Sequence, residues 1–157
     1  MTLKKKGFTL IETTIYIALF ALLLSGAIGA SFGFIDSSKK STRDAFTAEE
    51  ALFIIQKINW LIANALITEP ALDHESEVLS VTKTDELFRD NPFVMKTQEK
   101  TLHLKRGSSQ ANILHKSNDT LEYFLVNRTK EENREKIFVS FTLNGIPYSE
   151  YLFITKK

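Results

Sequence analysis

Residues 4–12 read Lys4-Lys5-Lys6-Gly7-Phe8-Thr9-Leu10-Ile11-Glu12, and an apolar run continues behind them to about Ile35. Three lysines are followed by a glycine and by a phenylalanine that opens the long hydrophobic segment. One carboxylate, Glu12, stands at the fifth position of that segment. A carboxylate at the edge of hydrocarbon costs about 2.5 kcal/mol or more, so Glu12 indicates a function that involves a specific partner.

This order of basic leader, Gly7, Phe8 to Glu12 and long apolar run resembles the type IV prepilins. That family includes pilins, minor pilins, the pseudopilins of type II secretion and the competence pilins. The resemblance is close from residue 4 to about 35. It implies that a membrane prepilin peptidase cleaves between Gly7 and Phe8 and N-methylates Phe8, and that Glu12 attracts the terminal ammonium of a neighbouring subunit. The predicted processing residues are Lys4, Lys5, Lys6, Gly7 and Phe8, and the predicted assembly residue is Glu12.

Elementary chemistry agrees with this resemblance. A glycine at the cleavage point has no side chain to obstruct a protease cleft. Cleavage creates a new positive charge close to Glu12, and the two charges can pair between staggered subunits. Such a pair attracts strongly in a low-dielectric surrounding, where a missing partner is costly.

Two simpler interpretations compete with a prepilin. A secretory signal peptide would use Phe8 to Leu24 as its apolar region and Ala27-Ile28-Gly29 or Ile28-Gly29-Ala30 as its cleavage site. The length of the apolar segment and the charge of Glu12 argue against it. An uncleaved signal anchor is the second alternative, but a plain anchor does not require this glycine and the five residues after it.

Composition bounds the classes that remain. The chain has 157 residues, a length that favours one domain plus an anchor, and its net charge is +1. Loss of a leader over residues 1–7 would remove three lysines and move the balance to −2, so no strong field favours nucleic acid or acidic substrates. The chain has no cysteine, and this excludes disulfides and thiolate metal sites.

The apolar run predicts a transmembrane helix over residues 8–35, with a length of roughly 42 Å at ~1.5 Å per residue. The lysines before it predict a cytoplasmic N-terminus with the remainder of the chain outside the inner membrane. Small residues from Ser25 to Ser31 fit either close helix packing in lipid or a locally loosened helix, and both interpretations stay open.

An amphipathic half of the same helix is predicted over residues 36–67. Pro70 predicts its end by about Thr68. Its apolar positions recur at steps of three and four residues; they are Ala48, Ala51, Leu52, Ile55, Ile58, Ile62, Ala65 and Leu66, and Phe53, Ile54, Trp60, Leu61 and Ile67 widen the stripe.

Residues 68–157 are strand-like and predict an antiparallel sheet head that buries one face against the helix. The expected strands are 77–82, 93–97, 101–106, 111–115, 121–126, 137–143 and 148–155. Asn144-Gly145 is a strong hairpin signal, and 129–136 is expected to be a charged loop. The predicted fold class is therefore α+β, with a long N-terminal helix on an antiparallel β-sheet head, an order also found in the prepilin families.

Candidate chemistry is sparse. His74, His103 and His115 lack metal-ligand spacing, and Asp73-His74-Glu75 is interpreted as a solvated loop. Ser117-Asn118-Asp119-Thr120 has too few carboxylates to predict calcium binding. The acceptor patterns for glycosylation at Asn118 and Asn127 are short and frequent by chance.

Two basic clusters favour a solvated surface over a nucleic-acid site, because glutamates are interspersed in the second. They are Lys105-Arg106 and Arg128, Lys130, Arg134, Lys136. We predict no catalytic residue, no metal and no cofactor.

The resulting prediction is a prepilin-like subunit, with a weak preference for a minor pilin or pseudopilin. Its partners would be the prepilin peptidase, other pilin or pseudopilin subunits, the inner-membrane assembly platform and membrane lipid. The alternative is a tethered or secreted binding module that joins no filament.

Overall fold

The structure is a computed structural model that describes residues 9–84, 91–115, 119–131 and 134–154. The chain divides into two units, Met1–Asp44 and Ala45–Lys157. Each unit is described by itself. The predicted leader, residues 1–7, lies outside the described residues.

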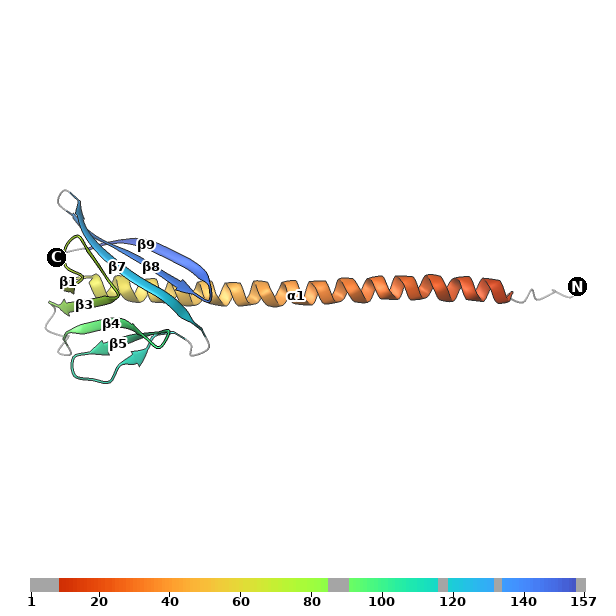
Figure 1. Cartoon of the computed structure of the whole chain (residues 1–157), viewed down its shortest axis with the longest axis horizontal. Helices are drawn as coiled ribbons and strands as arrows, with labels where there is room; N and C mark the ends of the chain where they lie inside the picture. The colour runs from red at the N-terminus through yellow and green to blue at the C-terminus, as the bar shows by residue number, and fades with distance from the viewer. Residues whose placement is uncertain (1–8, 85–90, 116–118, 132–133, 155–157) are drawn as a thin grey trace, which may run out of the picture. The chain divides into compact units, whose positions relative to one another are not determined.

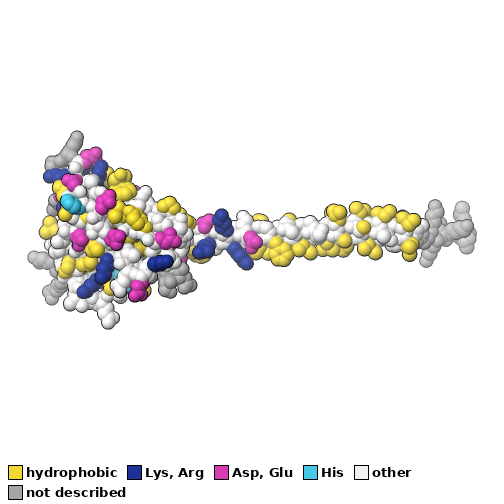
Figure 2. All heavy atoms as spheres, in the orientation of Figure 1, with side chains coloured by type: hydrophobic (Ala, Val, Ile, Leu, Met, Phe, Trp, Pro, Cys, Tyr) yellow, Lys and Arg dark blue, Asp and Glu magenta, His cyan; other side chains and the backbone are white. Residues whose placement is uncertain are grey.

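The described part of the first unit is helical and belongs to helix α1 (Leu10–Ile62) (Figure 1). Every side chain from Thr9 to Asp44 is exposed, including the large apolar ones. On the face drawn in Figure 2, hydrophobic side chains line most of this stretch and charged ones gather at its C-terminal end; Glu12 is an exposed carboxylate near its start. A helix that is apolar all round has no surface suited to water and is typical of a segment that lies in lipid.

In the second unit, the last turns of α1 carry a buried stripe formed by Thr47, Ala51, Ile54, Ile58, Leu61 and Ile62. The three- and four-residue steps predicted from the sequence are confirmed, but the stripe has a different centre. Ile54 and Leu61, expected only to widen it, are fully buried, whereas Leu52 is 58% exposed. Ala51, Ile58 and Ile62 of the predicted stripe are buried as well, so the buried face overlaps the predicted one and is turned toward Ile54 and Leu61.

Two antiparallel sheets complete the second unit, in place of the single sheet that was predicted. One has the order β1-β3-β4-β5-β6 and the other the order β2-β7-β8-β9. Their strands are β1 (Ala65–Glu69), β2 (His74–Ser76), β3 (Val78–Lys83), β4 (Phe93–Gln98), β5 (Thr101–Arg106), β6 (Asn112–Ile113), β7 (Leu121–Glu131), β8 (Arg134–Leu143) and β9 (Ile146–Phe153).

The end of α1 lies between the two sheets, with β7, β8 and β9 on one side and β4 and β5 on the other (Figure 1). One hydrophobic cluster joins all three elements. It includes Ile58 from the helix, Leu79 and Met95 from the first sheet, and Val126 and Phe141 from the second. The predicted α+β fold is confirmed, and the helix packs on two sheets because it has apolar residues on more than one side.

Helix α1 ends at Ile62, five residues before the predicted end at Ile67. Asn64 has a φ of 51°, a left-handed conformation that terminates helices. The Nζ of Lys83 donates hydrogen bonds to the last free carbonyls, those of Trp60 (2.5 Å) and Ala63 (2.6 Å). Because these partners end the helix, the apolar run after Asn64 becomes strand β1, and Pro70 lies beyond it.

Strands β7 and β8 are longer than predicted, and the expected charged loop at 129–136 is mostly strand. Their register places Lys130 opposite Glu135 and Glu131 opposite Arg134. Opposite charges facing each other across a ladder stabilise pairing, so charge does not break these strands. Residues 132–133, between the two strands in sequence, lie outside the described residues.

A bulge between Leu121 and Tyr123 changes the predicted alternation in β7. Leu121 was expected to share a face with Leu125, but it is buried on the side of Phe124 and Val126. The extra residue in the bulge lets an apolar residue on each side of it point to the core.

The predicted hairpin at Asn144-Gly145 is confirmed as the connection between β8 and β9. Both residues have positive φ, 52° and 78°, as a two-residue turn of type I′ requires. The Asn144 amide also links three segments. Its Nδ2 donates to Thr47 Oγ1 (3.2 Å) on the helix and to Asp119 Oδ1 (2.7 Å), while its Oδ1 accepts from Thr120 N (2.9 Å).

Candidate assembly site at the helix N-terminus

The predicted processing residues Lys4, Lys5, Lys6, Gly7 and Phe8 lie outside the described residues. The site that can be described begins at Thr9, the residue before the first turn of α1. Here Thr9 and Glu12 hydrogen-bond each other reciprocally: Thr9 N donates to Glu12 Oε2 (3.4 Å), and Glu12 N donates to Thr9 Oγ1 (3.3 Å).

This reciprocal pair is a capping box, in which a threonine and a glutamate three residues later satisfy free amides of the first helical turn. Both distances are at the long end of the hydrogen-bond range, so the pair is weak. This contact was not predicted, although residues 9–12 carry its signal, Thr-x-x-Glu. Glu12 therefore has two candidate roles, a local helix cap and a charge for a partner.

The other polar side chains near the start of the helix turn inward on their own backbone. Thr13 Oγ1 and Thr14 Oγ1 both donate to the Leu10 carbonyl at 2.8 Å, and Ser25 and Ser31 make similar bonds further along. Hydroxyls bonded in this way can enter lipid without an unsatisfied donor. Glu12 cannot enter lipid in this way, because its carboxylate keeps its charge after it accepts the capping hydrogen bond.

The length and composition of α1 allow it to cross a membrane, and no part of its most apolar window is buried inside the protein. The predicted assembly role belongs to Glu12, a carboxylate near one end of the apolar segment of α1. The side chains of that segment are exposed on every side.

The three histidines lie on separate elements with separate partners. His74 belongs to strand β2, not to the predicted loop, and its Nδ1 lies 3.0 Å from the Leu72 carbonyl. His103 Nε2 lies 2.6 Å from Thr101 Oγ1, and the buried His115 accepts a hydrogen bond from Leu102 N through Nε2 (3.0 Å). Within the described residues no three His, Cys, Asp or Glu side chains form a group that could hold a metal ion.

The remaining candidates are engaged in the fold. In the possible calcium loop, Ser117 and Asn118 lie outside the described residues and Asp119 Oδ1 accepts from Asn144. Asn127, a possible glycosylation acceptor, is half-buried in β7, and its Nδ2 donates to Glu75 (3.3 Å).

Two members of the second basic cluster have acidic partners. Arg128 pairs with Glu135 (2.6 Å), and Lys136 pairs with Glu131 (2.5 Å). Lys136 pairs with the exposed Glu131, which agrees with the predicted solvated surface. The side chains of Arg128 and Glu135 are only 18% and 17% exposed, so this part of the cluster is not the solvated surface that was predicted.

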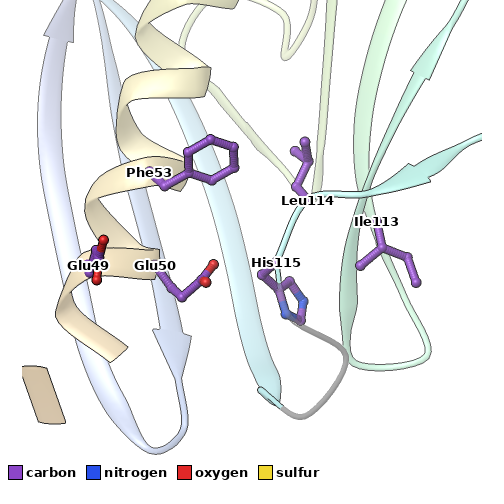
Figure 3. Close-up of a pocket in the computed structure, with 6 residues that line it drawn as sticks. All are labelled: Glu49, Glu50, Phe53, Ile113, Leu114 and His115. Carbon is purple, nitrogen blue, oxygen red and sulfur yellow. The ribbon is translucent and has the colours of Figure 1, made fainter. Parts of the chain in front are cut away.

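A surface hollow of about 370 Å³ opens beside residues 49–53 of α1 (Figure 3). Phe53 projects from the helix on one side, and Ile113 and Leu114 lie on the other side. The remaining lining residues are Glu49, Glu50 and His115. His115 accepts a hydrogen bond from Leu102 N through Nε2, so this atom is already engaged by the fold.

Comparison with known proteins gives one finding at the N-terminus. Residues 2–28 match the family model of the prokaryotic N-terminal methylation motif. The predicted signal of type IV prepilins and pseudopilins is thereby confirmed for this stretch. The curated proteins and the solved structures contain no match to the chain.

Proposed function

We propose that this chain is a prepilin-like subunit that is cleaved, N-methylated and assembled through its N-terminal helix into an extracytoplasmic filament. The N-terminal methylation motif at residues 2–28 carries the proposal. The exposed apolar surface of α1 supports it, since such a surface needs either lipid or the helices of neighbouring subunits around it.

Processing would proceed from the cytoplasmic side of the inner membrane. Lys4, Lys5 and Lys6 would hold the leader there, and Gly7 would leave the backbone open to the peptidase between Gly7 and Phe8. The product would keep the whole helix as an anchor, with the head of residues 68–157 and the amphipathic helix segment outside. The new ammonium of Phe8, once methylated, would be the partner for a carboxylate.

Glu12 would supply that carboxylate during assembly. In lipid the capping box leaves the charge of Glu12 uncompensated, and the ammonium of a neighbouring subunit would neutralise it. The inner-membrane assembly platform would then add each subunit in the register set by this pair. Within the family, a minor pilin or pseudopilin fits better than a major subunit, because the head is rich in phenylalanine and charge.

Intact-mass and N-terminal peptide analysis of the protein from its native membrane tests the processing step. A chain that starts at Phe8 and is heavier by one methyl group is the expected result. A start after Gly29 or Ala30 would indicate an ordinary secreted domain, and an intact Met1 would indicate a tethered binding module; either outcome contradicts the proposal.

Two substitutions separate the roles of Glu12. Glu12→Gln removes the charge but keeps an acceptor for the Thr9 amide, whereas Thr9→Ala removes half of the cap and keeps the charge. We expect Glu12→Gln to abolish filament recovery and Thr9→Ala to preserve it, with equal amounts of both variants in the membrane. The reverse pattern would make Glu12 a helix cap and would remove charge pairing from the mechanism.

A further inference from the structure

Strand β9 forms one edge of the second sheet, and it is the longest edge strand of the described head. It is eight residues long, and among the residues that the structure describes it pairs with β8 alone. The β8–β9 hairpin closes on Leu143 and Ile146, so hydrogen bonds to β8 recur at every second residue from Ile146. The bond from Ile154 N to the Glu135 carbonyl (3.0 Å) has the same parity.

The alternate residues therefore direct their backbone groups away from β8. At the start of the strand this position is Pro147, which has no N–H to offer and blocks pairing there. Ser149, Tyr151 and Phe153 follow, each with an outward N–H and C=O.

The other edges of the two sheets are closed or short. Arg128 Nη1 donates to the Ile67 carbonyl (3.0 Å) at the edge strand β1. Strand β6 and the bond from Leu114 N to the Leu102 carbonyl cover β5, and β2 has only three residues. Soluble proteins commonly protect long edges with charge, and the outward positions of β9 have none.

The side chains beside this edge form an aromatic patch, defined here as the half-buried Phe138 and the exposed Tyr151 and Phe153, and Lys136 Nζ lies 5.5 Å from the centre of the Tyr151 ring. Tyr151 and Phe153 are 56% and 59% exposed, and the Phe138 ring lies 4.8 Å from that of Tyr151. On the opposite face of the strand Glu150 is exposed and is the only charged residue of β9.

We propose that the β9 edge at residues 149–153 binds an extended polypeptide segment by strand addition. A row of unpaired N–H and C=O groups fits a polypeptide backbone, and the aromatic patch favours apolar residues at alternate positions of the added strand. Glu150 favours a basic residue on its other face. This binding activity belongs to the head and does not depend on filament assembly.

The test uses the full chain in detergent and a synthetic peptide, Val-Lys-Val-Lys-Val-Lys-Val, whose valines share one face and whose lysines share the other. We expect the peptide to slow amide hydrogen exchange at Ser149, Tyr151 and Phe153. At a peptide concentration ten times the Kd, the slowing should be about tenfold. Absence of protection at these amides would overturn the proposal.

Two N-methylated peptides are the matched probes. One has methyl groups on the valine amides and the other on the lysine amides, so each blocks one edge of the added strand. Strand addition requires that one peptide loses binding while the other keeps it. Equal binding of both peptides would show that the aromatic patch binds them through side-chain contacts alone, and would refute strand addition.

Protein variants give an independent measurement. Ser149→Pro removes an outward N–H and no bond to β8, so it should weaken peptide binding at least tenfold at an unchanged unfolding temperature. Ser149→Ala keeps the N–H and should bind like the wild type; equal binding by Ser149→Pro would contradict the proposal. If the three amides become protected with rising protein concentration and no peptide, a second copy occupies the edge, and the proposed occupant is wrong.

Discussion

Lys83 offers the sharpest test of how the helix end is held. Its side chain is buried, with only 7% of the residue exposed, and its ammonium donates to the carbonyls of Trp60 and Ala63 while it lies 4.8 Å from the centre of the Trp60 ring. Substitution of Lys83 by methionine keeps the aliphatic volume and removes both hydrogen bonds. The two carbonyls at the end of α1 then lose their charged donor.

The expected loss of stability follows from these contacts. Each hydrogen bond from a charged donor contributes about 1.5–3 kcal/mol, and relief from burying the ammonium offsets part of that sum. We expect Lys83→Met to lower the free energy of unfolding by about 2–3 kcal/mol. For a unit of roughly a hundred residues this corresponds to a fall in Tm of about 10 °C.

Thermal unfolding of the full chain in detergent, followed by near-ultraviolet circular dichroism, measures this change. Lys57 is a matched control, because its Nζ lies 4.5 Å from the same Trp60 ring but the residue is only half-buried. Lys57→Met should cost about 0.5 kcal/mol. If Lys83→Met is as stable as the wild type, the burial cost of the ammonium cancels its bonds and our account of the helix end is wrong.

Two further substitutions test the packing of the head in the same assay. Arg128→Leu removes the guanidinium that joins Glu135 to the Ile67 carbonyl. The free energy of unfolding should fall by about 2–3 kcal/mol, because the ion pair is mostly buried. A change below about 0.5 kcal/mol, the value typical of an exposed ion pair, would refute this. Ile58→Ala should cost about 3 kcal/mol, whereas Leu52→Ala on the exposed side of the same helix should cost less than about 0.5 kcal/mol. Similar losses for both would show that the buried stripe is wrongly placed.

The sequence predicted those elements whose causes are local. A continuous apolar run predicts a helix whatever its surroundings, and Asn144-Gly145 predicts a two-residue turn because both positions need positive φ. Strand β5 was placed correctly at Thr101–Arg106 from alternation alone. The methylation motif was recognisable for the same reason, since its residues are contiguous.

The missed features depend on partners distant in the chain. The end of α1 depends on Lys83, twenty residues after Ala63, and spacing within the helix cannot reveal that contact. The division into two sheets depends on β2 pairing with β7 rather than with β3, its neighbour in the sequence. The charged residues at the end of β7 and the start of β8 are typical of a loop when the sequence is considered alone. The strand register places opposite charges across from each other, so these residues belong to the strands.

At the candidate site, sequence reasoning found Glu12 but gave it one role. The spacing of Thr9 and Glu12 also predicts the helix cap that the structure shows. A charge that serves a neighbouring subunit cannot be verified within one chain, so that role stays a prediction.

The three-way contact of Asn144 has a consequence for chemical ageing. Asparagine followed by glycine is the dipeptide in which the backbone nitrogen most readily attacks the side-chain amide, with loss of ammonia. In this chain the Asn144 side-chain amide must first break its hydrogen bonds with Thr47, Asp119 and Thr120. The folded hairpin, whose turn requires this dipeptide, therefore also slows the reaction. The product would be a carboxylate close to that of Asp119. Damage at this turn would therefore weaken the contacts of residue 144 with Thr47 and Asp119 that had delayed it, and an aged head would loosen first where Thr47 of α1 meets the β8–β9 hairpin.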